Sequence, residues 1–263
     1  MENLLDFIGI KKNHHYLIHS SFKSIKDNTE YKVPQDFIFA LMERMTPEGS
    51  IIMPTFTYNF VKKDKTHQIF EKFTSPSWTG YLTDFFRELP YVYRTSSPTH
   101  SFAVWGKVIE IIDNYDNPKS PLGKDSLMDW LANTPNTHII MFGVDFRSLS
   151  FGHYLEVVAK VPWYNTFCWD YMNIEPKSED IFGIYDLIEV PGCSQSFNNF
   201  ENYLLENNII EKKYYNNLLV YNLEVNTLLH HGMQYFNENY KNLLCLPNRC
   251  ATCDERRKKL NLF

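Results

Sequence analysis

The chain of 263 residues is poor in glycine, has no excess of one charge and has no long apolar run. Its 10 glycines form neither GxGxxG nor a P-loop GxxxxGK, which excludes the common dinucleotide and P-loop phosphate motifs. No apolar run reaches the ~20 residues that span a bilayer. The N-terminus lacks the basic region and apolar core of a signal peptide. We therefore expect a cytoplasmic protein without a membrane span.

Charge and cysteine content exclude two further classes of protein. Lys+Arg number 26 against 31 Asp+Glu, a net charge of -5, which argues against a nucleic-acid binder. Five cysteines are an odd number, so a disulfide framework is not expected, and reduced thiols or a metal site are the alternatives. With 44% hydrophobic and 22% charged residues, we expect one domain over 1–263, with 245–263 as a cysteine-containing C-terminal extension.

Short apolar runs alternate with helical patterns along the chain. Runs typical of strands lie at 15–19, 51–53, 92–93, 102–105, 138–142, 184–190 and 218–221. Helical patterns lie at 34–45, 79–89, 108–112, 127–131, 197–205 and 223–236. This alternation predicts an α/β fold in which helices flank a central mixed sheet. The basic tail 255–263 is expected to be mobile.

Four polar clusters each follow an apolar run: His19–Ser21, Pro54–Thr57, Ser97–Ser101 and His153–Glu156. Because the ends of neighbouring strands meet at one edge of a sheet, we expect these side chains to gather there. The i,i+3 spacing of His153 and Glu156 puts both on one helix face, where a carboxylate can orient an imidazole that accepts a proton. Each cluster alone also fits a helix cap, a turn or a buried polar contact.

Read in order, these clusters and their flanks resemble the aminoglycoside 3-N-acetyltransferase family, also called antibiotic N-acetyltransferases. Five segments carry the resemblance: LIHSSFKSI (17–25), PQDFIFALMERMTPEGSIIMPTFT (34–57), SPSWTGYLTDFFRELPYVYRTSSPTHSFAVWG (75–106), SPLGKDSLMDWL (120–131) and IIMFGVDFRSLSFGHYLEVVAKVPW (139–163). They cover most of the first 163 residues. One departure is Ser97, where many family members have a second histidine.

The resemblance implies direct transfer of an acetyl group from acetyl-coenzyme A to an amine of an amino sugar, without a covalent enzyme intermediate. It implies that His153 is the general base, with Glu156 beside it. Histidine suits this role because an alkylamine is protonated at neutral pH, and hydroxyl or backbone N–H donors would stabilise the oxyanion of the thioester. The resemblance places these residues near the coenzyme: Ser20, Ser21, Thr55, Thr57, His100 and Ser101. Arg94 is a candidate phosphate ligand, since guanidinium suits phosphate oxygens.

The acceptor is less constrained. Aromatic residues crowd the stretch after the His-x-x-Glu motif: Trp163, Tyr164, Phe167, Trp169 and Tyr171. Such rings suit stacking on a sugar or nucleobase, so we favour a nucleotide-linked amino sugar for a surface glycan, although these rings also fit a core. An aminoglycoside antibiotic is the alternative. Its several cations call for carboxylates, which are available at Asp145, Glu156, Asp170 and Glu175. The oligomeric state stays open.

The C-terminal segment carries Cys245-LPNR-Cys250-AT-Cys253, which has the short spacing of a metal knuckle. A fourth ligand could come from Cys193, a histidine or another subunit, and a metal-free reduced tail is equally open, so zinc is not predicted. A hexapeptide-repeat acyltransferase is excluded because the glycines lack periodicity. A hydrolase with Cys193 or Ser101 as nucleophile is disfavoured because no GxSxG occurs. A non-catalytic metal-binding module would leave His153 and Glu156 unexplained.

Overall fold

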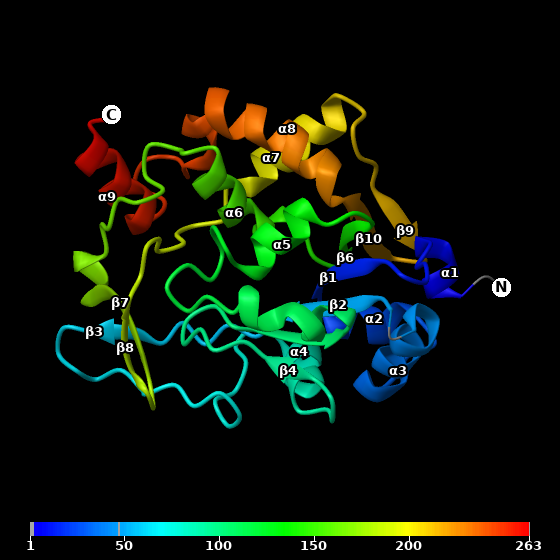
Figure 1. Ribbon diagram of the computed structural model, residues 1–263. Helices are drawn as coiled ribbons and strands as arrows, with labels where there is room; N and C mark the ends of the chain where they lie inside the picture. The colour runs from blue at the N-terminus through cyan, green and yellow to red at the C-terminus, as the bar shows by residue number, and fades with distance from the viewer. Residues whose placement is uncertain (1–2, 47, 263) are drawn as a thin grey trace.

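The computed structural model describes residues 3–46 and 48–262, and its centre is a seven-stranded sheet of order β4-β5-β2-β1-β6-β10-β9 (Figure 1). A three-stranded sheet of order β3-β7-β8 lies at one side. The strands are β1 (His15–Ser20), β2 (Ser50–Pro54), β3 (Phe60–Lys62), β4 (Tyr93–Arg94), β5 (Phe102–Gly106), β6 (Thr137–Phe142), β7 (Ile174–Asp180), β8 (Gly183–Asp186), β9 (Lys213–Tyr215) and β10 (Leu218–Glu224). β1 pairs in parallel with β2 and β6, and the other pairings described in this sheet are antiparallel. The predicted mixed sheet is confirmed.

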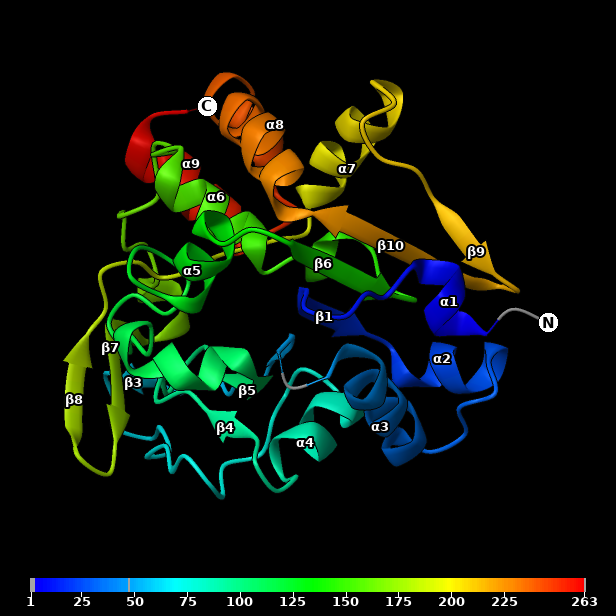
Figure 2. The same cartoon turned by 45° about the vertical axis from the view of Figure 1, so that its right-hand side comes forward.

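Helices cover both faces of the large sheet (Figure 2). The α-helices are α1 (Leu4–Ile8), α2 (Phe22–Asn28), α3 (Pro34–Met45), α4 (Tyr81–Arg87), α5 (Leu127–Asn133), α6 (Phe151–Val158), α7 (Phe197–Glu206), α8 (Val225–Glu238) and α9 (Ala251–Leu260). Short 3-10 helices are η1 (Lys107–Asn114), η2 (Phe146–Ser148), η3 (Asp170–Met172) and η4 (Tyr240–Leu243). α1 to α4 pack on one face and α5 to α8 on the other, so the sheet separates two apolar layers.

Alternation along each strand fills both layers. In β6, Ile140 and Phe142 pack toward α1 to α4, whereas Ile139 and Met141 pack toward the opposite helices. This follows from the two-residue period of an extended chain. Each of these four side chains is fully buried, and burying one such side chain stabilises a fold by about 1.5–3 kcal/mol. The same burial on both faces explains why the strands appear in the sequence as continuous apolar runs.

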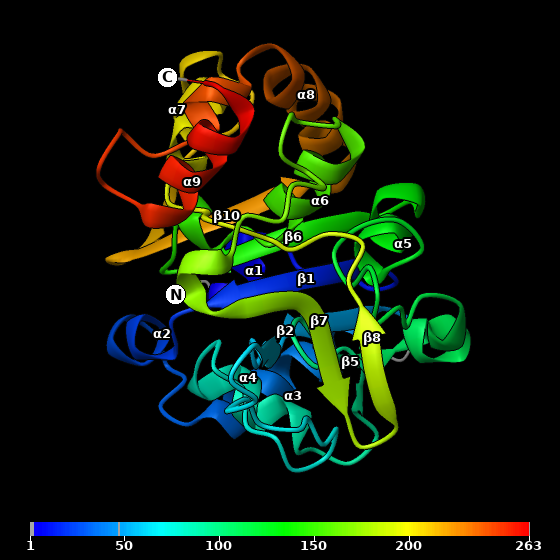
Figure 3. The same cartoon turned by 90° about the vertical axis from the view of Figure 1, so that its left-hand side faces the viewer.

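Two predictions for the C-terminal half need correction. The predicted strand 184–190 is wrong beyond Asp186, where β8 ends, and its partner β7 was not predicted because the sequence IEPKSED lacks apolar alternation. The tail predicted to be mobile instead forms α9, on the same side of the sheet as α7 and α8 (Figure 3). Arg256 and Arg257 are buried there, because both guanidinium groups have partners inside the fold. Phe263, the last residue of that tail, lies outside the described residues.

Within the described ranges, none of the helices combines the length and apolar character that crossing a bilayer requires.

Candidate functional site

A cleft of about 240 Å³ opens where the parallel strands β1, β2 and β6 end. Its walls are the segments that follow these strands, residues 78–83, and the first turn of α6. A second, more polar hollow of about 530 Å³ adjoins it and shares Val144, Arg147 and Ser148 with the cleft. The carboxyl edge of parallel strands is where α/β proteins place ligand sites.

His153 projects from α6 and lines this cleft. Its Nδ1 lies 2.6 Å from Oε2 of Glu156, one helical turn along. The Phe197 ring packs against the imidazole at 5.1 Å between centroids. Gly152 permits this approach, since an added Cβ would lie 2.4 Å from the Phe197 ring. The helix and its neighbour therefore hold the imidazole in one orientation.

Glu156 is 4% exposed and has three partners. Besides the His153 ring, Trp163 Nε1–H donates to Oε1 at 2.8 Å, and Arg256 Nη1 lies 3.5 Å from the same oxygen. Burial alone would raise the pKa of this carboxyl. The hydrogen bond and charge of His153 and the charge of Arg256 outweigh burial, so the pKa lies below its ordinary value. Glu156 is therefore a buried carboxylate.

This carboxylate sets the chemistry of His153. When Nδ1–H donates to Glu156, the other ring nitrogen, Nε2, carries a lone pair that can accept a proton. Glu156 also stabilises the imidazolium that proton uptake creates. The arrangement is that of a general base held in its productive tautomer.

His19 and Ser20, at the end of β1, also line the cleft. His19 Nε2 lies 3.3 Å from Ser150 Oγ, and burial lowers the pKa of His19 to about 3, so its imidazole is neutral. Ser20 Oγ is buried and has no hydrogen-bond partner among the residues that the structure describes. A buried hydroxyl without a partner is a group available to a ligand. Both residues belong to the polar cluster His19–Ser21 that was expected at the sheet edge, although only Ser20 was expected near the coenzyme.

Ser21, the next residue, has a structural position. It is the N-cap of α2, and its Oγ accepts the backbone N–H of Ser24 at 3.3 Å. Its own backbone N–H donates to the carbonyl of Phe142, which ties the β1 end to β6. The structure thus separates two neighbouring serines, one lining the cleft and one capping a helix.

The PTFT segment presents its apolar residues to the cleft. Pro54, Phe56 and Tyr58 line it, while Thr55 and Thr57 are buried behind them. Backbone hydrogen bonds from Thr55 to Ser101 and from Thr57 to Thr99 continue the strand pairing, along which successive side chains alternate, and Tyr58 then has a left-handed backbone with φ 54°. Thr57 Oγ1 donates to the carbonyl of Pro98, and Thr55 Oγ1 lies 3.1 Å from Ser101 Oγ. Both hydroxyls therefore belong to the support of the cleft wall.

Arg94 lies beneath the surface, 4% exposed. Its Nε donates to Ser101 Oγ at 3.0 Å and its Nη2 to the carbonyl of Thr55 at 2.8 Å, while Nη1 donates to the carbonyls of Lys72 and Ser75. Ser101 Oγ in turn donates to the Thr55 carbonyl at 2.8 Å. These contacts join three chain segments, and neither Arg94 nor Ser101 is in the described lining of the cleft.

His100 lies behind the cleft wall. Its ring packs against Phe56 at 4.7 Å and Tyr58 at 5.4 Å between centroids. Burial, with a smaller effect of the His153 charge, lowers the pKa of His100 to about 3. Ser97 accepts the backbone N–H of His100 at 3.0 Å and so caps this turn, at the position where the family often has histidine. Of the predicted coenzyme residues, the cleft lining thus includes Ser20 alone.

The aromatic stretch that favoured a nucleotide-linked acceptor lies elsewhere. Trp163 is buried in the core, where it donates to Glu156, and Trp169 stacks on Tyr171 at 6.5 Å. The described lining of the cleft includes none of the five aromatic residues of that stretch. The exposed aromatic residues in the cleft lining are Trp78 and Tyr58, which were not among the predicted site residues.

Each of the four carboxylates that were considered for binding a polycation already has a partner within the protein. Asp145 pairs with Arg147 at 2.7 Å, Asp170 with Lys63 at 2.5 Å, and Glu175 with Lys177 at 3.3 Å. Glu156 faces the interior. No Asp or Glu stands in the described lining of the cleft. The polar side chains in that lining are hydroxyls, the imidazoles of His19 and His153, and Arg147.

The chain is similar to known proteins over most of its length. The sequence model of the family described as Aminoglycoside 3-N-acetyltransferase matches residues 17–237. The SPbeta prophage-derived aminoglycoside N(3')-acetyltransferase-like protein YokD of Bacillus subtilis (strain 168) is 26% identical over 170 residues, 58% of this chain. That match spans 61% of the relative's own length.

Solved structures share the fold. The apoenzyme of aminoglycoside acetyltransferase AAC(3)-IVa has a TM-score of 0.79 at 22% identity, covering 97% of this chain and 93% of that chain. A mutant of AAC(3)-IVa was solved in complex with a gentamicin, with a TM-score of 0.76 at 22% identity over the same shares. AAC-IIIb, solved as a binary complex with CoASH, has a TM-score of 0.72 at 16% identity, covering 89% of this chain and 94% of that chain.

Proposed function

Because the chain belongs to the aminoglycoside 3-N-acetyltransferase family, we propose that it transfers the acetyl group of acetyl-coenzyme A to an amine of an aminoglycoside-type amino sugar. One observation carries the proposal: His153 lines the cleft with its Nδ1 held by the buried Glu156 carboxylate. Two relatives support the choice of substrates, one solved with CoASH and one with a gentamicin. The proposal includes a cytoplasmic location, where acetyl-coenzyme A is at hand.

His153 acts on the acceptor amine. Its Nε2 takes a proton from the amine as the nitrogen attacks the thioester carbonyl, so that a C–N bond forms and the C–S bond breaks. The departing sulfur receives the proton, which yields free coenzyme A thiol and the N-acetyl product. Glu156 stabilises the imidazolium between these two proton transfers, at a hydrogen-bond distance of 2.6 Å.

Ser20 supplies a donor for the carbonyl oxygen. Negative charge gathers on that oxygen during attack, and one well-placed donor lowers the barrier by about 3 kcal/mol. The Oγ–H of Ser20 is buried at the cleft without another partner in the described part of the chain.

The cleft and the adjoining polar hollow together form a groove suited to a long coenzyme. Arg147 stands where the two meet, and its side chain is 53% exposed in a bidentate pair with Asp145. A coenzyme phosphate would compete with Asp145 for this guanidinium, whose planar fork suits phosphate oxygens. We propose Arg147, in place of Arg94, as the coenzyme phosphate ligand.

An aminoglycoside-type acceptor fits the cleft better than a nucleotide-linked sugar. The aromatic stretch that suggested a nucleobase lies away from the cleft, so that argument falls. Trp78, 72% exposed, and Tyr58, 50% exposed, are in the cleft lining, and aromatic rings have electron-rich faces. Such faces attract ammonium groups as well as sugar rings. They supply the recognition of cations that carboxylates were expected to provide.

The test is the release of coenzyme A thiol from acetyl-coenzyme A over a panel of aminoglycosides and nucleotide-linked amino sugars. We expect turnover of at least one aminoglycoside, and a loss of about 10²–10⁴-fold in His153→Gln with coenzyme binding retained. His138→Gln is the matched control, because His138 pairs with Asn222 outside the cleft. Activity confined to nucleotide-linked sugars would restore the other acceptor, and an active His153→Gln protein would refute the mechanism.

A further inference from the structure

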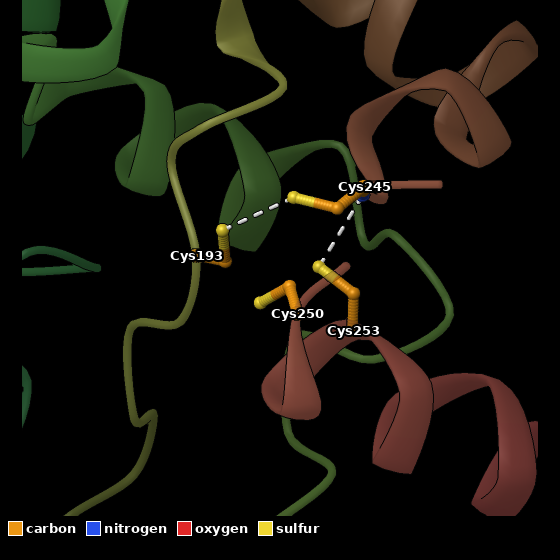
Figure 4. A group of neighbouring side chains, drawn as sticks. All are labelled: Cys193, Cys245, Cys250 and Cys253. Carbon is orange, nitrogen blue, oxygen red and sulfur yellow. Dashed lines mark hydrogen bonds between the residues drawn. The ribbon is translucent and has the colours of Figure 1, made fainter. Parts of the chain in front are cut away.

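Outside the cleft, four of the five cysteines meet at one place (Figure 4). The sulfur atoms of Cys193, Cys245, Cys250 and Cys253 all lie within 4.8 Å of one another. Cys193 comes from the loop between β8 and α7, Cys245 from the segment after η4, and the last two from the start of α9. The fold therefore adds a fourth thiol to the three that are close in sequence.

The spacing of the sulfurs fits one tetrahedral metal ion. A Zn–S bond of about 2.3 Å places the sulfurs of a regular ZnS₄ site about 3.8 Å apart. The Sγ atoms of Cys193 and Cys245 are 3.5 Å apart. A disulfide, with a bond of about 2.05 Å, joins only two thiols and would leave the other pair without a role. The Cys-x-x-Cys turn of 250–253 is the spacing that structural zinc sites use.

Hydrogen-bond donors point at three of the four sulfurs. The backbone N–H of Gln195 donates to Cys193 Sγ and that of Cys245 to Cys253 Sγ, each at 3.4 Å. Ser196 Oγ–H donates to Cys245 Sγ at 3.5 Å. Donors of this kind stabilise thiolates and orient metal ligands. The surroundings therefore suit sulfur in the charged form that binds metal.

We propose that these four thiolates bind a single Zn²⁺, which staples α9 to the loop before α7. Thiolate ligands select soft or borderline ions, and four protein ligands close the coordination sphere, as in structural zinc sites. Cys193 and Cys245 stand 52 residues apart in sequence, so the ion closes a long loop. Its binding free energy adds to that of folding.

The staple has a consequence for the dyad of His153 and Glu156. Arg256 follows Cys253 on α9, and its guanidinium packs so close to Gly192 that an added Cβ there would lie 2.5 Å from Nη2. The guanidinium lies over the Trp163 ring at 5.5 Å, and its Nη1 lies 3.5 Å from Glu156 Oε1. The metal thus holds a positive charge beside that carboxylate. This consequence rests on the proposed function, whereas zinc binding itself does not.

Metal analysis of the full chain, purified without chelator and in the presence of a reductant, tests the site. We expect elemental mass spectrometry to find one zinc ion per chain. A thiol titration of the chain denatured with a chelator should find five free thiols. Cys250→Ser should lower zinc affinity by at least about 10–100-fold, because losing only a group that hydrogen-bonds to a metal ligand already costs that much. Cys168→Ser, which alters the one cysteine outside the cluster, should keep its zinc.

The result that overturns the proposal is a folded, metal-free protein, a disulfide among these cysteines, or iron in place of zinc. Should Cys250→Ser fail to fold, cobalt exchange into the unaltered chain decides, because four thiolates give tetrahedral Co²⁺ its charge-transfer and ligand-field bands. Absence of those bands also overturns it. Zinc-loaded protein without acetyl transfer would refute the proposed function and leave the metal site standing. The dyad consequence predicts a fall in kcat when zinc is withdrawn from active protein.

Discussion

Replacing Glu156 by Gln removes the buried negative charge beside His153 and leaves the buried Arg256 guanidinium without its anionic partner. Gln has the same length and can still meet the His153 ring and the Trp163 N–H. What it cannot do is stabilise a positive imidazolium as an anion does. The substitution therefore tests both roles of the carboxylate, its charge and its hold on the His153 tautomer.

The magnitude follows from the geometry. With 2.6 Å between Nδ1 and Oε2, the centres of the imidazolium and carboxylate charges lie about 4 Å apart, an attraction of about 4 kcal/mol at an effective dielectric constant of 20. Each 1.36 kcal/mol is about tenfold in rate, so kcat should fall by about 10³. KM for acetyl-coenzyme A should stay unchanged, because the imidazolium exists only while the proton is in transit.

The assay is thiol release at saturating acceptor, with thermal unfolding measured beside it. Glu201→Gln is the matched control. Glu201 is 3% exposed, accepts the Tyr221 O–H and lies outside the cleft lining. We expect that variant to keep kcat within about twofold. A folded Glu156→Gln protein whose kcat lies within about fivefold of the original would refute the claim that this carboxylate supports the base.

Three further predictions concern stability. Burial raises the pKa of Glu189 from 4.5 to about 7, although the hydrogen bond from Ser120 acts to lower it. The unfolded chain therefore loses that proton at a lower pH than the folded chain does. As a result, the free energy of unfolding should fall by about 3 kcal/mol as pH rises from 4.5 to 7. Urea unfolding measured at several pH values should show a smaller fall in Glu189→Gln. Arg94→Met should lower that free energy by about 2–4 kcal/mol without changing KM for acetyl-coenzyme A; a raised KM at full stability would restore its phosphate role. Gly152→Ala should destabilise by about 1–3 kcal/mol in calorimetry, with partial rescue by Phe197→Leu, because the new Cβ meets that ring; an unchanged melting temperature contradicts this.

Much of the fold could be predicted from local pattern. The runs at 15–19, 51–53 and 138–142 are continuous and apolar because helices cover both faces of β1, β2 and β6. His153 and Glu156 meet because three residues along a helix is nearly one turn, a relation that tertiary contacts did not have to create. The hairpin of β7 and β8 was harder to predict, because the polar sequence of its strands has no regular alternation of apolar residues.

Which side chains after β2 line the cleft could not be predicted from the sequence. Polar residue types drew the prediction to Thr55 and Thr57, but one face of an extended chain carries every second residue. The structure turned Pro54, Phe56 and Tyr58 to the cleft. Residue type alone does not say which of these side chains a ligand meets; the pairing of Thr55 and Thr57 with the neighbouring segment and the left-handed backbone of Tyr58 decide it.

By itself, the sequence determined the mixed α/β fold and the His153–Glu156 pair, because both follow from contacts within a few residues or from the period of burial. Only the tertiary structure brought Arg256 to Glu156, from 100 residues away, and Cys193 to the three C-terminal cysteines. Such contacts depend on how α9 packs against the loop before α7. No local period records that packing, because its energy comes from groups that meet only once the chain has folded.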